Sequence, residues 1–141
     1  MKSEKGKGEE RRVKGEENPR RDLPERTFEF ARRIVVLCRE LERAGGVSWT
    51  LVRQLMRAGT SIGANVEEAQ ASQSRADFAA QCSIACKEAR ETHYWLRLIA
   101  ACEPGDERLR EIIDESNQLV AILTTVVKTT RANTRKPRNQ Q

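Results

Sequence analysis

Residues 48–69, SWTLVRQLMRAGTSIGANVEEA, form the stretch on which the fold prediction depends. Their apolar residues recur every three or four positions, which predicts an α-helix with one buried stripe. This stripe comprises Leu51 or Val52, Leu55, Gly59, Ile62, Val66 and Ala69. Gly59 and Gly63 lie in the helix interior, where a glycine costs about 1 kcal/mol relative to alanine. We therefore expect a neighbouring helix backbone to approach closely at both glycines, and Ser48 to be the N-cap.

The segment before this one has the same periodicity. It begins after Asp22-Leu23-Pro24, where the aspartate favours an N-cap and the proline a first helical turn, and it ends at Gly45-Gly46. Its expected core residues are Phe28, Ala31, Ile34 or Val35, Cys38 and Leu41, with Phe30 and Leu37 along a second edge.

Two more helices are expected downstream. The third follows the polar loop 72–75 and ends near Cys102, before Pro104-Gly105. Its apolar stripe comprises Phe78, Cys82, Ala85, Ala89, His93 or Tyr94, Leu96, and Ile99 or Ala100. The fourth has the stripe Leu109, Ile112, Ser116, Leu119, Leu123, and Val126 or Val127. No convincing strand pattern competes, and short connections make neighbouring helices antiparallel. The sequence therefore predicts an all-α, antiparallel up-and-down four-helix bundle of either hand.

Charge is unevenly distributed along the 141 residues, whose formal net charge is +5. Residues 1–22 carry 8 basic and 6 acidic side chains, residues 128–141 carry 5 basic and no acidic ones, and the part between them is close to neutral. Segments with so little apolar content cannot offset their ordering entropy by burial. We expect a disordered charged tail over 1–22, the bundle over 23–130 and a disordered basic tail over 131–141.

Two further patterns concern the compartment. The sequence has no apolar run of about 18 residues, and no apolar stretch follows the N-terminal charges as in a secretory signal. We therefore expect a cytoplasmic protein that contacts no membrane. In a reducing compartment the cysteines of apolar helical patterns are expected to be buried free thiols: Cys38, Cys82, Cys86 and Cys102.

The chain contains few of the residue patterns that catalytic sites need. His93 is its only histidine, so a catalytic triad is not indicated and the two Glu-x-x-His motifs of a di-metal bundle site are absent. Cys82 and Cys86 lie four positions apart, which differs from the C-x-x-C spacing of metal sites. No glycine-rich phosphate loop follows a strand. We expect no enzyme, no catalytic residue, no metal and no cofactor.

Basic residues gather at two places suited to a polyanion. Arg53 and Arg57 lie one turn apart, with no acidic residue between Ser48 and Glu67. The C-terminal end, also free of acids, holds Lys128, Arg131, Arg135, Lys136 and Arg138. Because basic side chains bind phosphate, these seven residues are the candidate nucleic-acid contacts. The remaining arginines are interspersed with acids and predict solvated pairs.

Some polar residues flank the apolar stripes of the second and third helices, namely Asn65, Glu68, Lys87 and Glu88. A ligand pocket, a polar network between the helices, and exposure to solvent or a neighbouring subunit are all open. Because burying an unpaired charge is costly, we favour the network or exposure.

Four motifs occur in an order typical of one family. They are RTFEFA at 26–31, RAGTSIGANVEEA at 57–69, Ser74-x-x-Asp77-Phe78, and IACKEARETHYWL at 84–96. Over about residues 23–127 the chain resembles the bacterial four-helix-bundle family that includes proteins encoded within intervening sequences of large-subunit ribosomal RNA genes. The family's usual Asn-Ile-Ala-Glu-Gly reads NVEEA at 65–69 here, which alters the expected local packing but not the fold.

The resemblance implies a four-helix bundle that assembles as a homopentamer, with no catalytic residues assigned. The fold is also similar to that of diversity-generating retroelement accessory proteins, which form pentameric barrels that bind nucleic acid and a reverse transcriptase. Our leading hypothesis is a non-enzymatic, oligomeric RNA- or DNA-binding accessory factor. The alternative is a protein-interaction scaffold without nucleic-acid binding, including a partner of a reverse transcriptase. An enzyme or metal protein is the least supported hypothesis.

Overall fold

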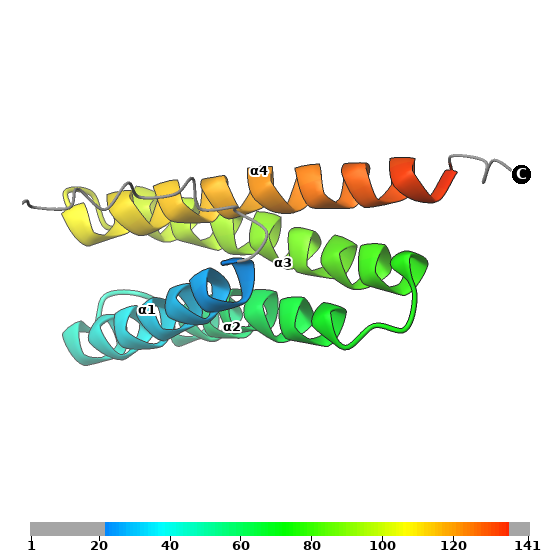
Figure 1. Cartoon of the computed structure of the whole chain (residues 1–141). Coiled ribbons are helices and arrows are strands. Elements are labelled where there is room, and N and C mark those ends of the chain that lie inside the picture. Colours follow the sequence, from blue (N-terminus) through cyan, green and yellow to red (C-terminus); the bar gives the residue numbers. More distant parts are fainter. Residues whose placement is uncertain (1–21, 136–141) are drawn as a thin grey trace, which may run out of the picture.

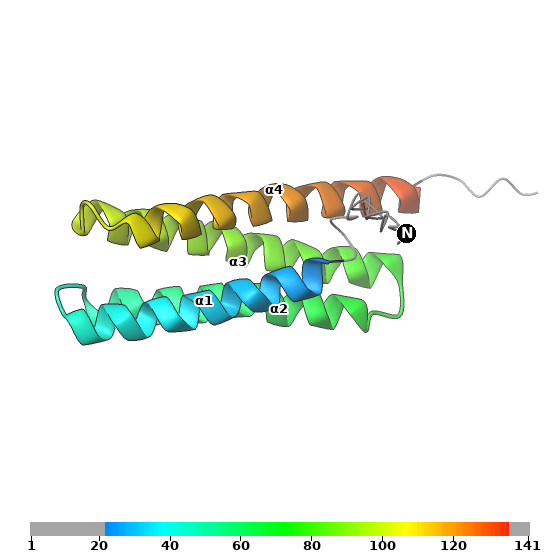
Figure 2. The same ribbon diagram turned by 60° about the vertical axis from the view of Figure 1, so that its left-hand side comes forward.

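The computed structural model describes residues 22–135, and that range forms four α-helices and no strand. The helices are α1 (Leu23–Ala44), α2 (Trp49–Gln70), α3 (Arg75–Cys102) and α4 (Glu107–Arg135). Successive helices run in opposite directions along one long axis (Figure 1). The α1–α2 hairpin lies against the α3–α4 hairpin, as Figure 2 shows from a second side. The predicted all-α, antiparallel up-and-down bundle is confirmed.

Each helix packs along the next one in sequence, whereas α1 and α4 contact each other at few positions. Two ion pairs bridge those outer helices. Arg26 of α1 bonds to Glu115 of α4 over 2.7 Å, and Arg108 of α4 bonds to Glu40 of α1. One core runs through all four helices, and a smaller apolar cluster (Ala69, Cys82, Val126 and Val127) lies near the C-terminal end of α4.

Gly59 and Gly63 lie where α2 passes closest to α1. A Cβ atom on Gly59 would lie 2.8 Å from Cγ2 of Ile34, and one on Gly63 would lie 3.2 Å from the carbonyl oxygen of Thr27. Both distances are shorter than ordinary van der Waals contact, so a side chain at either position would push α1 away. The close packing offsets the helix-propensity cost of the glycines. The predicted close approach of a neighbouring backbone is confirmed at Gly63, whereas at Gly59 the nearest atoms belong to the side chain of Ile34.

The buried face of α1 differs from the predicted stripe. Phe28 is 66% exposed, whereas Phe30 is 1% exposed and belongs to the core. Thr27 takes a fully buried position on that face. Its hydroxyl donates a hydrogen bond to the carbonyl oxygen of Leu23 over 2.8 Å, so no polar atom is left unsatisfied. Ile34, Cys38 and Leu41 of the predicted stripe are buried. The prediction was wrong at Phe28, because it counted only apolar residues.

A threonine also corrects the stripe of α3. Thr92 is fully buried and donates to the carbonyl oxygen of Glu88 over 2.7 Å. Tyr94, one of the two alternatives for this position, is 50% exposed, and the other, His93, is half-buried. The stripes predicted for α2 and α4 are buried as expected.

The helix ends follow the sequence only in part. Asp22 and Ser48 occupy the predicted N-cap positions, but neither side chain accepts a capping hydrogen bond. At α3, Oγ of Ser74 accepts one from the N–H of Asp77 over 3.1 Å.

Helix α4 runs to Arg135, past the predicted boundary at residue 130. No glycine or proline occurs between Asp106 and Lys136, so nothing in the sequence of α4 breaks the helix. The part of the predicted basic tail at 131–135 is therefore helical. The rest of both predicted tails, 1–21 and 136–141, lies outside the described residues.

Candidate nucleic-acid interface

The C-terminal part of α4 carries an exposed basic stripe. The last buried residue of the helix is Val127, and Lys128, Arg131 and Arg135 beyond it are exposed. Their spacing of three and four residues places them on one side of the helix. None of them takes part in an ion pair among residues 22–135. We call these three residues the basic end of α4.

No acidic residue follows Glu115 in the chain, so the charge of the basic end is not balanced along its own helix. The two remaining C-terminal candidates, Lys136 and Arg138, lie outside the described residues. They follow Arg135 in the sequence and add to the same run of positive charge.

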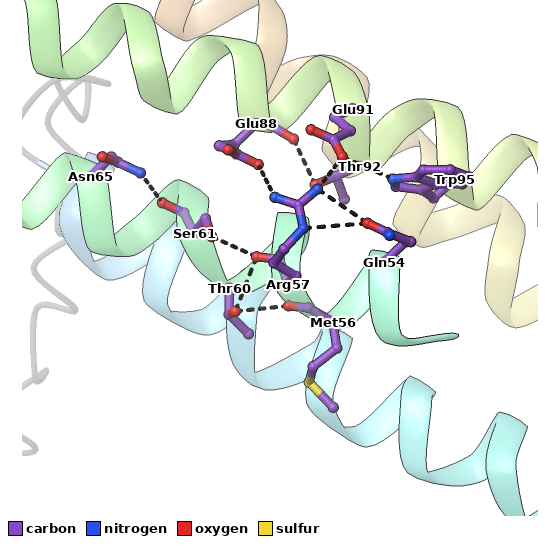
Figure 3. A network of polar contacts seen from close by, with 10 residues as sticks. All are labelled: Gln54, Met56, Arg57, Thr60, Ser61, Asn65, Glu88, Glu91, Thr92 and Trp95. Carbon is purple, nitrogen blue, oxygen red and sulfur yellow. Dashed lines mark hydrogen bonds and ion pairs between the residues drawn. The ribbon is translucent and has the colours of Figure 1, made fainter. Parts of the chain in front are cut away.

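The other predicted pair, Arg53 and Arg57, has a different environment. The guanidinium carbon of Arg53 lies 4.4 Å from the ring centroid of Trp49, a cation–π contact on an exposed surface. Arg57 forms ion pairs with Glu91 and, over 3.4 Å, with Glu88, both on α3 (Figure 3). The charge of Arg57 is therefore balanced, although no acid lies near it on α2. Sequence reasoning missed this because it compared residues along one helix only.

The two basic regions are not brought together. Figure 1 places the start of α2 and the end of α4 at opposite ends of the bundle. Of these two regions, the basic end of α4 is the one in which every described basic residue is exposed and takes part in no ion pair among residues 22–135.

Of the polar residues beside the α2 and α3 stripes, Glu88 links the two helices through its ion pair with Arg57 (Figure 3). Besides Arg57, Oε1 of Glu91 accepts a hydrogen bond from Nε1 of Trp95 over 3.2 Å (Figure 3). Nδ2 of Asn65 donates to the carbonyl oxygen of Ser61 over 2.8 Å, within α2. Glu68 and Lys87 are exposed. The interpretation as a network or as exposed side chains is confirmed for Glu68, Lys87 and Glu88, whereas Asn65 is half-buried and bonds within its own helix.

Residues 22–135 contain no group of three or more histidine, cysteine, aspartate or glutamate side chains placed to hold a metal ion. His93 lies half-buried on α3, where burial and then the charge of Arg97 lower its pKa. None of the described helices is both long enough and apolar enough to cross a membrane.

The cysteines fall into two groups. Cys38, Cys82 and Cys86 are buried, as predicted, whereas Cys102 is exposed near the end of α3. Burial, followed by the nearby charge of Glu42, raises the pKa of Cys38 to about 12. Burial also raises the pKa of Cys82. A buried thiol with a high pKa is a poor nucleophile because little thiolate is present at neutral pH.

We expect native protein to react with a thiol reagent such as dithionitrobenzoate at one fast site, Cys102. The buried thiols should react only as the bundle opens, because the reagent must reach them. Kinetics of thiolate release, followed by absorbance, give the number of fast sites. The variant Cys102→Ser should lose the fast phase, and Cys82→Ser should keep it. A fast phase that persists in Cys102→Ser would contradict the burial of the other three.

The fold and the basic end of α4 define a small all-α bundle protein. Residues 22–125 match the family of 23S rRNA-intervening sequence proteins, and the chain belongs to this family. It is also similar to a protein of unknown function from the S23 ribosomal protein family of Bacteroides thetaiotaomicron. That crystal structure shares 39% sequence identity and a TM-score of 0.69, over 75% of this chain and 98% of the other. None of the curated proteins matches the chain.

Proposed function

We propose that this protein is a non-enzymatic, homo-oligomeric accessory factor that binds nucleic acid through the basic end of α4. One observation carries the proposal: Lys128, Arg131 and Arg135 are exposed on one side of a helix that has no acid after Glu115. The bundle between the tails is close to neutral. A contact with phosphates is therefore expected at the basic end of α4 rather than over the whole surface.

Phosphate contacts of this kind give an affinity that depends strongly on salt. Each neutralised phosphate releases condensed counterions, and the five basic residues of 128–138 correspond to a slope of roughly −3 to −5 in log K against log salt. A homopentamer, which the family resemblance implies, multiplies the contact by avidity. The name of the family supports RNA as the first nucleic acid to test.

We expect Lys128→Gln/Arg131→Gln/Arg135→Gln to weaken RNA binding about 100-fold at about 0.1 M salt and to reduce the salt slope by about 3. Fluorescence anisotropy with a labelled structured RNA, titrated at several salt concentrations, measures both quantities. A duplex DNA of equal length, measured in parallel, shows which nucleic acid is preferred.

The matched control is Arg39→Gln/Arg43→Gln/Arg97→Gln, which removes the same charge from exposed arginines elsewhere on the bundle. It should lower the affinity far less than the α4 variant. Equal losses in the two variants would show a contact made by net charge alone. No binding of either nucleic acid by the wild-type protein at low salt would refute the proposed function.

A second candidate function, a protein-interaction scaffold, is supported by two exposed aromatic side chains. Phe28 on α1 is 66% exposed and Trp49 on α2 is 60% exposed. Exposed aromatic residues are enriched where proteins bind one another. A reverse transcriptase is the partner class that the resemblance implies. Binding of such an enzyme in the absence of any nucleic-acid affinity would favour the scaffold over the accessory factor.

A further inference from the structure

The exposed face of α4 is divided by charge. Its first half presents Glu107, Glu111 and Asp114, and its second half presents the three residues of the basic end. The small residue Ala121 lies exposed between them. Two other charges of the first half have partners elsewhere: Arg108 pairs with Asp106 and Glu40, and Glu115 pairs with Arg26.

Few of these face charges are paired within the chain. Glu107 lies 3.6 Å from Arg110 in an exposed pair, which contributes little. Asp114 accepts a hydrogen bond from Gln118 over 3.0 Å. Among residues 22–135, no ion pair includes Glu111, Asp114 or any residue of the basic end.

The acids and bases lie in matching positions around Ala121. Asp114 and Lys128 each lie 7 residues from it, Glu111 and Arg131 each lie 10, and Glu107 and Arg135 each lie 14. A second α4, placed antiparallel with a two-fold axis at Ala121, therefore brings each acid to the height of a base along the shared helix direction. Arg110, the remaining base of the acidic half, falls opposite Ala132, which is uncharged and also 11 residues from the centre.

The helix dipole does not explain this distribution. Acids near a helix N-terminus and bases near its C-terminus are favourable, but the effect falls off within the first and last turn. It accounts for Glu107 and Arg135 at the two ends of α4. It does not account for Glu111, Asp114, Lys128 and Arg131, which lie further inside.

We propose that the exposed face of α4 binds the same face of a second copy of this chain, antiparallel and about a two-fold axis at Ala121. Three acid–base pairings, each occurring twice by symmetry, align the two helices, and the small side chain at the axis allows a close approach. The helix is about 43 Å long and about 10 Å wide, so each copy contributes about 430 Å². This area is below that of standard stable interfaces, which gives a weak, salt-sensitive contact.

Such a contact closes at two copies. It therefore differs from the head-to-tail contact of a five-fold ring, and in a ring it would join two rings face to face. It also uses the side chains proposed to bind nucleic acid. One consequence rests on the proposed function: RNA and the second copy compete for the basic end, so self-association masks the site until a polyanion displaces it.

The test uses two charge-reversed full-length variants. The all-basic variant is Glu107→Lys/Glu111→Lys/Asp114→Lys, and the all-acidic variant is Lys128→Glu/Arg131→Glu/Arg135→Glu. Each should self-associate at least about 10-fold more weakly than wild type at about 0.1 M salt, because every pairing becomes repulsive. An equimolar mixture should restore association, since acids of one variant then meet bases of the other. Sedimentation equilibrium up to the high micromolar range gives the masses, and circular dichroism checks that each variant is folded.

A wild-type mass that never exceeds the monomer at low salt would overturn the proposal. So would a wild-type assembly whose mass is unchanged in both variants, or a mixture that fails to restore association. A mass that halves in each variant, from dimer to monomer or from paired to single rings, supports it. RNA binding is measured separately on the all-basic variant, which keeps the basic end. If this variant fails to bind RNA, the proposed function is refuted, whereas the sedimentation masses still test the contact between two copies.

Discussion

Replacing Gly59 by leucine is expected to lower the free energy of unfolding by about 3 kcal/mol. The new Cβ alone would lie 2.8 Å from Cγ2 and 2.9 Å from Cγ1 of Ile34. Isoleucine is branched at Cβ and has few rotamers, so it cannot move aside without shifting α1. Leucine regains about 1 kcal/mol of helix propensity, which is smaller than the cost of overpacking. Urea unfolding followed by circular dichroism measures the change.

The matched control is Ala64→Leu, which places the same side chain five residues along α2 at an exposed position. It should change the free energy of unfolding by no more than about 0.5 kcal/mol. Adding Ile34→Ala to Gly59→Leu should recover part of the loss, because the truncated side chain makes room for the new one. A non-zero coupling in this double-mutant cycle locates the clash at that pair. Equal effects of the two leucines would contradict the close approach of α1 and α2.

The elements of this fold can be predicted from sequence because each is amphipathic and bounded by a clear signal. Gly45-Gly46 ends the first helix, Ser74 caps the third, and Pro104-Gly105 follows it. The glycines of α2 even predicted where two helices touch. The exact face was harder to predict. Thr27 and Thr92 are buried because each hydroxyl bonds to its own helix, and a count of apolar residues cannot detect that.

The candidate site was predictable only where it depends on one segment. The basic run from Lys128 onward is visible in the sequence, since no acid interrupts it. The ion pairs of Arg57 are not visible in the sequence. Glu88 and Glu91 lie more than 30 residues away in the chain and reach Arg57 only through the packing of α2 on α3. A helix surface that is purely basic along the sequence can therefore be neutral in the folded protein.

The largest loss of stability is expected from Phe30→Ala, about 4 kcal/mol. Phe30 is 1% exposed in the main core, so truncation removes its buried surface and leaves a cavity that the surrounding helices fill only in part. Phe28→Ala, two residues away on the same helix, should change the free energy of unfolding by no more than about 0.5 kcal/mol, because that ring is 66% exposed. The two variants lose the same atoms, so their difference reports burial alone.

This pair of variants also tests the orientation of α1. The sequence pattern places both Phe28 and Phe30 among the expected core residues, whereas the structure buries Phe30 and exposes Phe28. Chemical denaturation of both variants decides between them: a large loss in Phe28→Ala with a small one in Phe30→Ala would mean that α1 is rotated from the structure described. Light scattering on Phe28→Ala adds a second reading. An unchanged stability with a reduced assembly mass would show that the exposed ring contacts another copy, which a residue facing only solvent cannot produce.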